Sequence, residues 1–102
     1  MKVVFSPLAL DRIAAIEARI VEVAGRATAD KVIAGFKQKA RMLATMPRMG
    51  RIVVELGDPA IRELIVAPYR MVYEVRDAVG LVEVHTVLHA RQQFPIDEFL
   101  DD

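Results

Sequence analysis

The spacing of the apolar residues changes once along this chain, and this change constrains the fold more than any other feature. Before residues 46–50 the apolar residues recur at steps of three and four, which is the spacing of one face of a helix. After residues 46–50 they alternate with polar residues, which is the spacing of a strand that buries one face. Pro47 and Gly50 lie at the boundary, and both residue types oppose helix continuation. The sequence therefore predicts helices first and a sheet second.

The first half predicts a short strand followed by two helices. The strand is expected at residues 2–5, and Ser6 and Pro7 then form the start of a helix, as a cap and as the first helical residue. Residues 25–28 supply a stop for this helix and a cap for the next one. The apolar stripes of the two helices are Ala9, Ile13, Ile16, Ile20 and Val23, and then Ala29, Val32, Ile33, Phe36, Ala40 and Leu43. Such closely joined helices form a helical hairpin.

The second half predicts strands at residues 61–66, 69–76 and 81–88, with a hairpin loop at residues 77–80. In the last strand, strict alternation places Val82, Val84 and Leu88 on one face. If the helices cover the apolar face, the opposite face, which carries Arg70, is expected to be open to solvent or to a partner. The predicted fold is one α+β domain over residues 1–102: an N-terminal strand and a helical hairpin packed on one face of a small antiparallel sheet, in the order β-α-α-β-β-β.

Composition excludes several classes of protein. Fourteen basic and fourteen acidic residues give a formal net charge of zero, so the chain lacks the overall attraction expected of a dedicated nucleic-acid binder. There is no cysteine and there are only two histidines, so we expect neither a metal site nor another cofactor. The first residues do not resemble an apolar leader and no apolar run is long enough to span a bilayer, so we expect neither export nor membrane insertion. The expected location is the cytoplasm, away from the membrane.

Charge is nevertheless uneven along the chain. No acidic residue lies between Asp30 and Glu55, and Lys37, Arg41 and Thr45 share the helix stripe opposite the apolar one. An ordinary solvated helix face would explain this basic stretch equally well. The last six residues are rich in acid, so the basic middle and the acidic tail at residues 97–102 either form separate surfaces or neutralise one another.

Four arginines lie at or near the ends of the predicted strands. Arginine is a fork-shaped donor suited to carboxylates and phosphates, so several on one sheet face predict a recognition surface. These four residues are Arg51, Arg62, Arg70 and Arg91. The alternative interpretation is that Arg62 and Arg70 pair across the sheet with Glu63, Glu74 or Glu83.

The order of elements, together with a series of short motifs, resembles the RelE/ParE toxin superfamily of bacterial type II toxin–antitoxin systems, and more closely its ParE-like members. The resemblance covers nearly the whole chain. Besides the leading strand and the helical hairpin, it rests on Pro47 with Gly50-Arg51, Glu55-Leu56, Arg62-Glu63, Tyr69-Arg70 with Val72-Tyr73, and His89-Ala90-Arg91.

The resemblance implies two possible mechanisms on one fold. RelE-like members are ribosome-dependent endonucleases of messenger RNA, whereas ParE-like members inhibit DNA gyrase, and a co-encoded antitoxin silences both. RNA cleavage needs a base, a cation for the charged phosphorane and an acid. Arg70 and Arg91 match the two arginines of the RelE pattern and His89 offers a base. However, Ile61-Arg62-Glu63 replaces a lysine-rich strand, and the tyrosine expected after the second arginine is absent.

The resemblance therefore predicts a ParE-like toxin without enzymatic activity that binds DNA gyrase and a cognate antitoxin, with the four arginines as anchors for target or antitoxin. The antitoxin segment is expected to bind as an amphipathic helix or an added strand in a toxin–antitoxin hetero-oligomer. Two alternatives stay open: a RelE-like endonuclease that uses Arg70, His89 and Arg91 on the ribosome, and a non-toxic family member that only binds its antitoxin. The acidic tail is an alternative cover for the arginines within the chain.

Overall fold

A computed structural model describes residues 1–100 of the chain, which have an α+β fold. Strand β1 (Lys2–Phe5) leads into helices α1 (Pro7–Ala24) and α2 (Arg26–Leu43). The strands β2 (Arg51–Ile52), β3 (Ile61–Val66), β4 (Tyr69–Arg76) and β5 (Leu81–His89) follow, with short 3-10 turns η1 (Asp77–Val79) and η2 (Ile96–Phe99). The predicted helices and strands are confirmed within one or two residues at most boundaries.

Local sequence explains the ends of the helices. The Ser6 hydroxyl accepts a hydrogen bond from the Ala9 amide at 3.0 Å, and Pro7 follows it as the first helical residue. Gly25 alone separates the two helices, a tighter junction than the four residues expected. Its φ of 91° lies in the region that favours glycine, and its amide donates to the Ile20 and Val21 carbonyls. One residue therefore ends α1 and starts α2.

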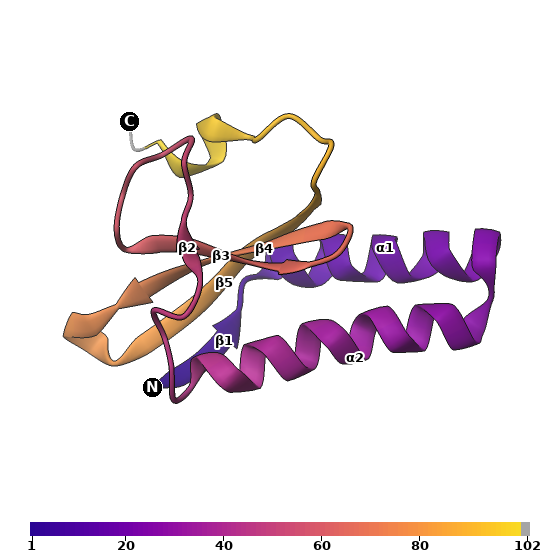
Figure 1. Cartoon of the computed structure of the whole chain (residues 1–102), viewed down its shortest axis with the longest axis horizontal. Coiled ribbons are helices and arrows are strands. Elements are labelled where there is room, and N and C mark those ends of the chain that lie inside the picture. Colours follow the sequence, from indigo (N-terminus) through magenta and orange to yellow (C-terminus); the bar gives the residue numbers. More distant parts are fainter. Residues whose placement is uncertain (101–102) are drawn as a thin grey trace.

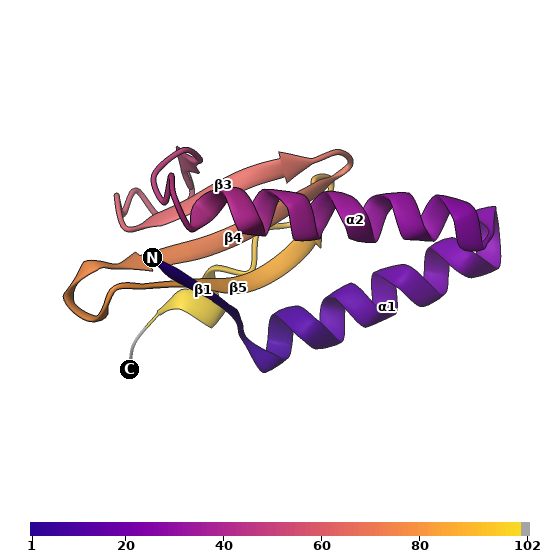
Figure 2. The same cartoon turned by 90° about the horizontal axis from the view of Figure 1, so that it is seen from below.

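The five strands form one mixed sheet in the order β1-β5-β4-β3-β2. Strand β1 runs parallel to β5, and the other neighbours are antiparallel. The α+β prediction is confirmed, with two additions: the parallel pair, and β2, which lies outside the predicted strands. Figures 1 and 2 show both helices on one side of the sheet, with the closed end of the hairpin extending past the strands. None of the helices within residues 1–100 is both long and apolar enough to cross a membrane.

The main core lies between the helices and the sheet. Phe36 and Leu43 of α2 pack there against Met71, Tyr73 and Val84 of the strands. Most residues of the predicted helix stripes belong to this core, namely Ala9, Ile13, Ile16, Val32, Ile33, Phe36 and Leu43. Of the other stripe residues, Val23 is exposed. Val23 belongs to the last turn of α1, next to the closed end of the hairpin, where no strand lies beneath the helix (Figure 2).

The prediction that the second face of the sheet is open is wrong. Val72 and Leu88 lie on that face and pack with Val53, Ile61 and Phe94 in a second apolar cluster. The loop between β2 and β3 and the segment that ends in η2 lie side by side over this face (Figure 1). Burial of these apolar side chains favours closure of the face by the two irregular segments.

An irregularity in the pairing of β4 with β5 explains why strict alternation fails in β5. The register shifts by one residue between Val72 and Tyr73, so His85 has no direct partner on β4. Beyond this point the faces exchange: Val87 joins Val84 in the main core, and Leu88 joins the second cluster. The expected grouping of Leu88 with Val82 and Val84 is therefore wrong.

Candidate functional site

Arg70 lies at the centre of a buried charge network rather than on an open surface. Its Nε and Nη2 donate to the two Glu63 carboxylate oxygens at 2.5 and 3.0 Å. Its Nη1 and Nη2 donate to the two Glu55 oxygens, both at 2.9 Å. Arg51 Nε approaches Glu63 Oε2 at 3.3 Å from the other side. We call these four residues, Arg51, Glu55, Glu63 and Arg70, the arginine cluster.

The fold places the members of the cluster within reach of one another. Glu63 of β3 pairs with Val72, and Ile65 pairs with Arg70, so Glu63 and Arg70 are diagonal neighbours across the two strands. Glu55 comes from the loop after β2. The guanidinium of Arg70 also lies 5.1 Å from the centroid of the Phe94 ring, which packs over the same face. Cross-strand pairing of Arg70 with Glu63, the alternative interpretation, is confirmed, whereas Glu74 and Glu83 pair with Arg76.

Burial makes the pairing in this cluster energetically important. The Glu63 side chain is 1% exposed and that of Arg70 is 10% exposed. Hydrogen bonds to Glu55 and Glu63 raise the pKa of Arg70, and the hydrogen bond from Arg70 is the main cause that lowers the pKa of Glu55. The positive charges of the two arginines equal the negative charges of the two glutamates. Four of the five N–H groups of Arg70 donate hydrogen bonds to these carboxylates. Loss of one partner would leave a buried charge without compensation.

Arg62 also makes contacts within the chain. Its Nε donates to the Pro59 carbonyl and its Nη1 to the Gly50 carbonyl, each at 3.0 Å, so it ties together two parts of the segment between α2 and β3. Gly50 is itself tightly packed, because its amide donates to Tyr73 Oη at 2.9 Å and a Cβ would lie 2.5 Å from the Glu63 carbonyl oxygen. Burial raises the pKa of Tyr73. Gly50 of the Gly50-Arg51 motif therefore has a packing role.

His89 and Arg91 lie at the end of β5. The backbone amide of Arg91 donates to His89 Nδ1 at 3.0 Å, and the His89 ring meets the Tyr69 ring edge-on at 5.7 Å. A neutral histidine that accepts at Nδ1 carries its proton on Nε2, so its second nitrogen is a donor. The structure thus joins Arg51 and Arg70 through Glu63, while Arg62 and Arg91 lie outside this cluster. Among residues 1–100, no three acidic or histidine side chains group as metal ligands.

The described part of the acidic tail does not cover these arginines. Glu98 of η2 instead receives both Nη groups of Arg12 from α1, at 2.5 and 3.0 Å. The same guanidinium donates to the Thr86 hydroxyl, so α1, β5 and η2 are joined at one point. Asp101 and Asp102, the rest of the predicted tail, lie outside the described residues.

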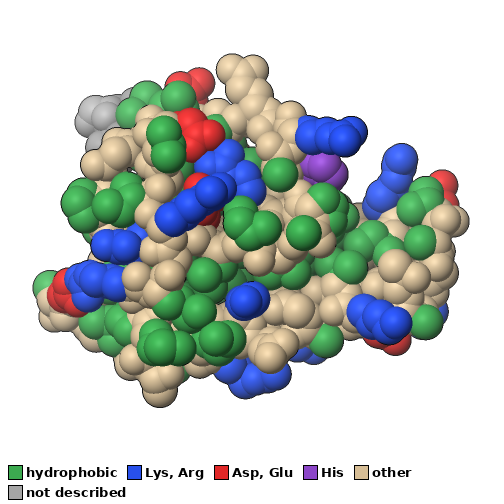
Figure 3. All heavy atoms as spheres, in the orientation of Figure 1, with side chains coloured by type: hydrophobic (Ala, Val, Ile, Leu, Met, Phe, Trp, Pro, Cys, Tyr) green, Lys and Arg blue, Asp and Glu red, His purple; other side chains and the backbone are tan. Residues whose placement is uncertain are grey.

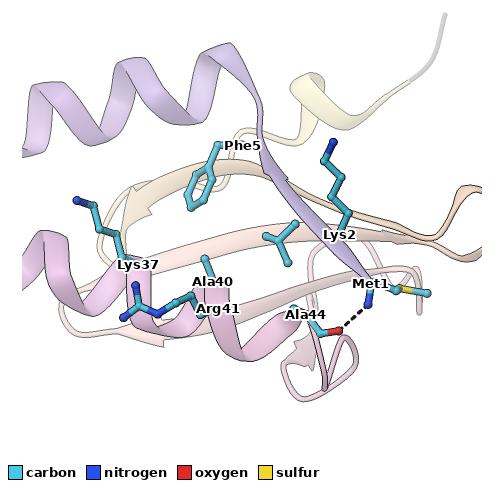
Figure 4. Close-up of a pocket in the computed structure, with 8 residues that line it drawn as sticks. Met1, Lys2, Phe5, Lys37, Ala40, Arg41 and Ala44 are labelled. Carbon is cyan, nitrogen blue, oxygen red and sulfur yellow. Dashed lines mark hydrogen bonds between the residues drawn. The ribbon is translucent and has the colours of Figure 1, made fainter.

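A second candidate site, which pattern reasoning missed, is a groove between β1 and α2. It encloses about 620 Å³, and Figure 4 shows Phe5 of β1 facing the α2 residues of its other wall. We call it the β1–α2 groove; its lining comprises Met1, Lys2, Val3, Phe5, Lys37, Ala40, Arg41 and Ala44. The Met1 amino group donates to the Ala44 carbonyl at 2.6 Å and closes one end. A second hollow of about 270 Å³ shares Phe5 and Lys37 and continues between the two helices.

The β1–α2 groove combines apolar walls, a strand edge and cations. Strand β1 is an outer strand. Its Lys2 amide donates to the carbonyl of Gly80, just before β5, and the amide of Ser6, just after β1, donates to Val84 of β5, so the alternating Val3 and Phe5 amides point away from the sheet. Lys37 and Arg41 lie one helical turn apart on the α2 wall, and neither forms an ion pair within residues 1–100. In the sequence, only the basic stripe of α2 pointed to this site. The groove itself forms only where β1 lies beside α2, which the sequence pattern does not show.

The region around β2 differs from the groove in how its charges are paired, and Figure 3 shows its surface. Basic, acidic and hydrophobic side chains lie together around β2 and the segment that follows it. In this region the basic groups of Arg51 and Arg70 are within ion-pair distance of carboxylates. The charges around β2 are therefore paired within the chain, whereas those of the groove are available to a partner.

Comparison with known proteins agrees with this architecture. A family model described as the ParE toxin of type II toxin-antitoxin system, parDE, matches residues 3–94. A solved structure of the chromosomal ParDE TA system from P. aeruginosa is similar with a TM-score of 0.72 and 16% identity, over 87% of this chain and 95% of that chain. The isolated E. coli RelE toxin is similar with a TM-score of 0.60 and 20% identity, over 96% of this chain and 93% of that chain.

The two levels of similarity support different statements. At 16% and 20% identity, the two solved structures show only that this chain has the same fold as they do. No protein of curated function matches the sequence. The family model, however, spans the chain from the first strand to Phe94. As the sequence motifs predicted, this chain belongs to the ParE toxin family of type II toxin–antitoxin systems.

Proposed function

We propose that this toxin inhibits DNA gyrase by binding it, and that a co-encoded antitoxin neutralises it. The main argument against RNA cleavage is that Arg70 is already bound by carboxylates of its own chain. Its guanidinium already binds two carboxylates through four hydrogen bonds, as it would bind a phosphate. A substrate phosphate would have to displace Glu55 and approach Glu63, and both carboxylates repel it.

The candidate base of an RNA-cleaving site, His89, is also poorly arranged. The Nδ1 of His89 accepts a hydrogen bond from the Arg91 amide, so the lone pair on this nitrogen is not available to a general base. A gyrase inhibitor needs a shaped surface with a few anchors and no acid–base pair. The ParE family membership and this geometry support the same function.

The function is tested with the purified full chain and purified DNA gyrase in a supercoiling assay. We expect loss of supercoiling at a small molar excess of toxin, and recovery when the antitoxin is added. In cells, brief induction should stop incorporation of labelled DNA precursors before that of protein precursors. Full supercoiling at large excess of folded protein would contradict the proposal, early loss of protein synthesis would favour the endonuclease alternative, and normal growth would favour the non-toxic one.

The β1–α2 groove is the surface that best fits the antitoxin. An added strand would meet the outward amides of Val3 and Phe5, and its apolar side chains would lie against Phe5 and Ala40. Acidic residues of the same segment would meet Lys37 and Arg41, which form no ion pair within residues 1–100. The antitoxin segment proposed here is therefore acidic and amphipathic.

A further inference from the structure

The edge of the sheet formed by β2 carries exposed apolar side chains beside Arg51. Val54 is 84% exposed, the highest value among the large apolar residues of the described chain, and Ile52 and Ile65 are also exposed. A hollow of about 240 Å³ lies among Val54, Ile65 and the arginine cluster. We call Arg51, Val54 and Ile65 the β2 surface.

The arginine cluster holds this surface in place. Val54 lies between Val53, which is fully buried, and Glu55, which is bound by two hydrogen bonds to Arg70. The turn is closed by hydrogen bonds from the Leu56 and Gly57 amides to the Val53 carbonyl, at 3.1 and 2.9 Å. Because both neighbours of Val54 are fixed, its side chain is presented to solvent without the freedom to turn inward. A fixed apolar anchor of this kind favours binding, since little ordering is needed on association.

The charges of the region indicate the chemistry of its partner. Glu55 and Glu63 are already bound by Arg70, whereas the Arg51 side chain is 65% exposed and reaches Glu63 at 3.3 Å through Nε alone. The remaining donors of Arg51 are available to an incoming carboxylate. The surface therefore fits a protein that presents an apolar side chain next to an acidic one.

The β2 surface and the β1–α2 groove belong to the two outer strands of the sheet, with β5, β4 and β3 between them. We propose that the β2 surface contacts the gyrase protein, through Val54 and Arg51, while the antitoxin segment occupies the groove at the other edge. This inference rests on the proposed gyrase function. Inhibition of gyrase and binding of the antitoxin are then separable by substitution.

The test compares Val54→Asp with Val79→Asp in the full chain. Val79 is 69% exposed, lies in η1 and belongs to neither surface, so it provides the same change in size and charge elsewhere. We expect Val54→Asp to raise the toxin concentration needed for half-inhibition of supercoiling by roughly tenfold or more. Val79→Asp should inhibit like the wild type, and both variants should bind the antitoxin with wild-type affinity. Arg51→Gln is a second variant, with a smaller expected loss of inhibition.

The outcomes separate this inference from the proposed function. If the wild type inhibits gyrase and Val54→Asp inhibits equally well, the β2 surface is not the contact. If Val54→Asp keeps its circular dichroism and unfolding midpoint but loses antitoxin binding together with inhibition, the two surfaces are not separate, and the inference is also overturned. If the wild type itself leaves gyrase active, the proposed function fails first, and the gyrase contact fails with it.

Discussion

The arginine cluster and the β1–α2 groove use the same kinds of side chain in opposite ways. In the cluster, Arg70 is buried and its charge is compensated by two glutamates of the same chain. In the groove, Lys37 and Arg41 are exposed and form no ion pair within the described residues. Arginines on strands suggested a binding surface, yet the cations most available to a partner lie mainly on a helix.

This difference shows that the presence of a charged residue in the sequence does not reveal whether its charge is free to bind a partner. Burial makes an unpaired charge costly, so a buried arginine recruits carboxylates from its own chain. An exposed lysine or arginine gains little free energy from an ion pair within its own chain, so it remains free to bind a partner. Substitutions in the cluster should therefore act first on stability, and substitutions in the groove should act first on binding.

The strongest test of this division is Arg70→Met. It leaves Glu55 and Glu63 without their shared cation, and we expect a loss of about 3–5 kcal/mol in the free energy of unfolding. Urea unfolding measures it. Arg41→Met, the matched loss of a cation in the groove, should change stability by less than about 0.5 kcal/mol. Similar stabilities for the two variants would contradict the division.

Gly50→Ala tests how closely the cluster region is packed. The new Cβ would lie 2.5 Å from the Glu63 carbonyl oxygen and 2.6 Å from Tyr73 Oη, so we expect a loss of about 1–3 kcal/mol in the same urea experiment. Gly57→Ala is the comparison, because nothing lies within 4 Å of a Cβ there and only the positive φ of 63° opposes the change. A Gly50→Ala protein as stable as the wild type would mean that this segment moves freely.

Lys37→Glu combined with Arg41→Glu tests the groove. Both carboxylates would face an acidic antitoxin segment, so we expect its dissociation constant to rise by roughly ten- to a hundredfold, which is about 1.4–2.8 kcal/mol, with little change in stability. Titration calorimetry at two salt concentrations measures the effect, and added salt should reduce it. Lys31→Glu, on α2 outside the groove lining, is the control. Equal loss of affinity in the control would indicate a general effect of charge.

Glu55→Gln should have the smallest effect, and that effect should depend on pH. Because Arg70 lowers the pKa of Glu55 in the folded protein, the ionised pair stabilises the fold above the unfolded pKa, and this contribution is lost as pH falls through the folded pKa. At pH 7 the variant should be less stable by about 1 kcal/mol or less, as for a partly exposed pair. In unfolding experiments at decreasing pH, the two proteins should converge. A constant difference down to acid pH would mean that Glu55 acts through packing.

Much of the fold could be predicted because it depends on neighbouring residues. Ser6 and Pro7 define the start of α1, Gly25 its end, and the two-residue alternation defines β4. Strand β2 could not be predicted, because two residues carry no period and pair only when β3 lies beside them. The register shift between β4 and β5 could not be predicted either, since it results from packing on both faces of the sheet.

The candidate sites were less accessible than the fold. The four arginines were recognised, but only Arg51 and Arg70 are brought together, and Arg62 makes contacts to backbone carbonyls. The groove escaped prediction because its two walls come from opposite ends of the helical region. Phe5 and Ala40 are 35 positions apart in the sequence and face one another only after β1 pairs with β5.

By itself, the sequence determined the order of all helices and strands except β2, the α+β class and the family, because each follows from periodicity, capping residues and motifs that lie close together in the chain. The tertiary structure alone decided which charges are paired and which are available. Ion pairing and burial depend on distances of a few ångström between residues far apart in sequence, and those distances exist only once the strands have paired and the helices have packed.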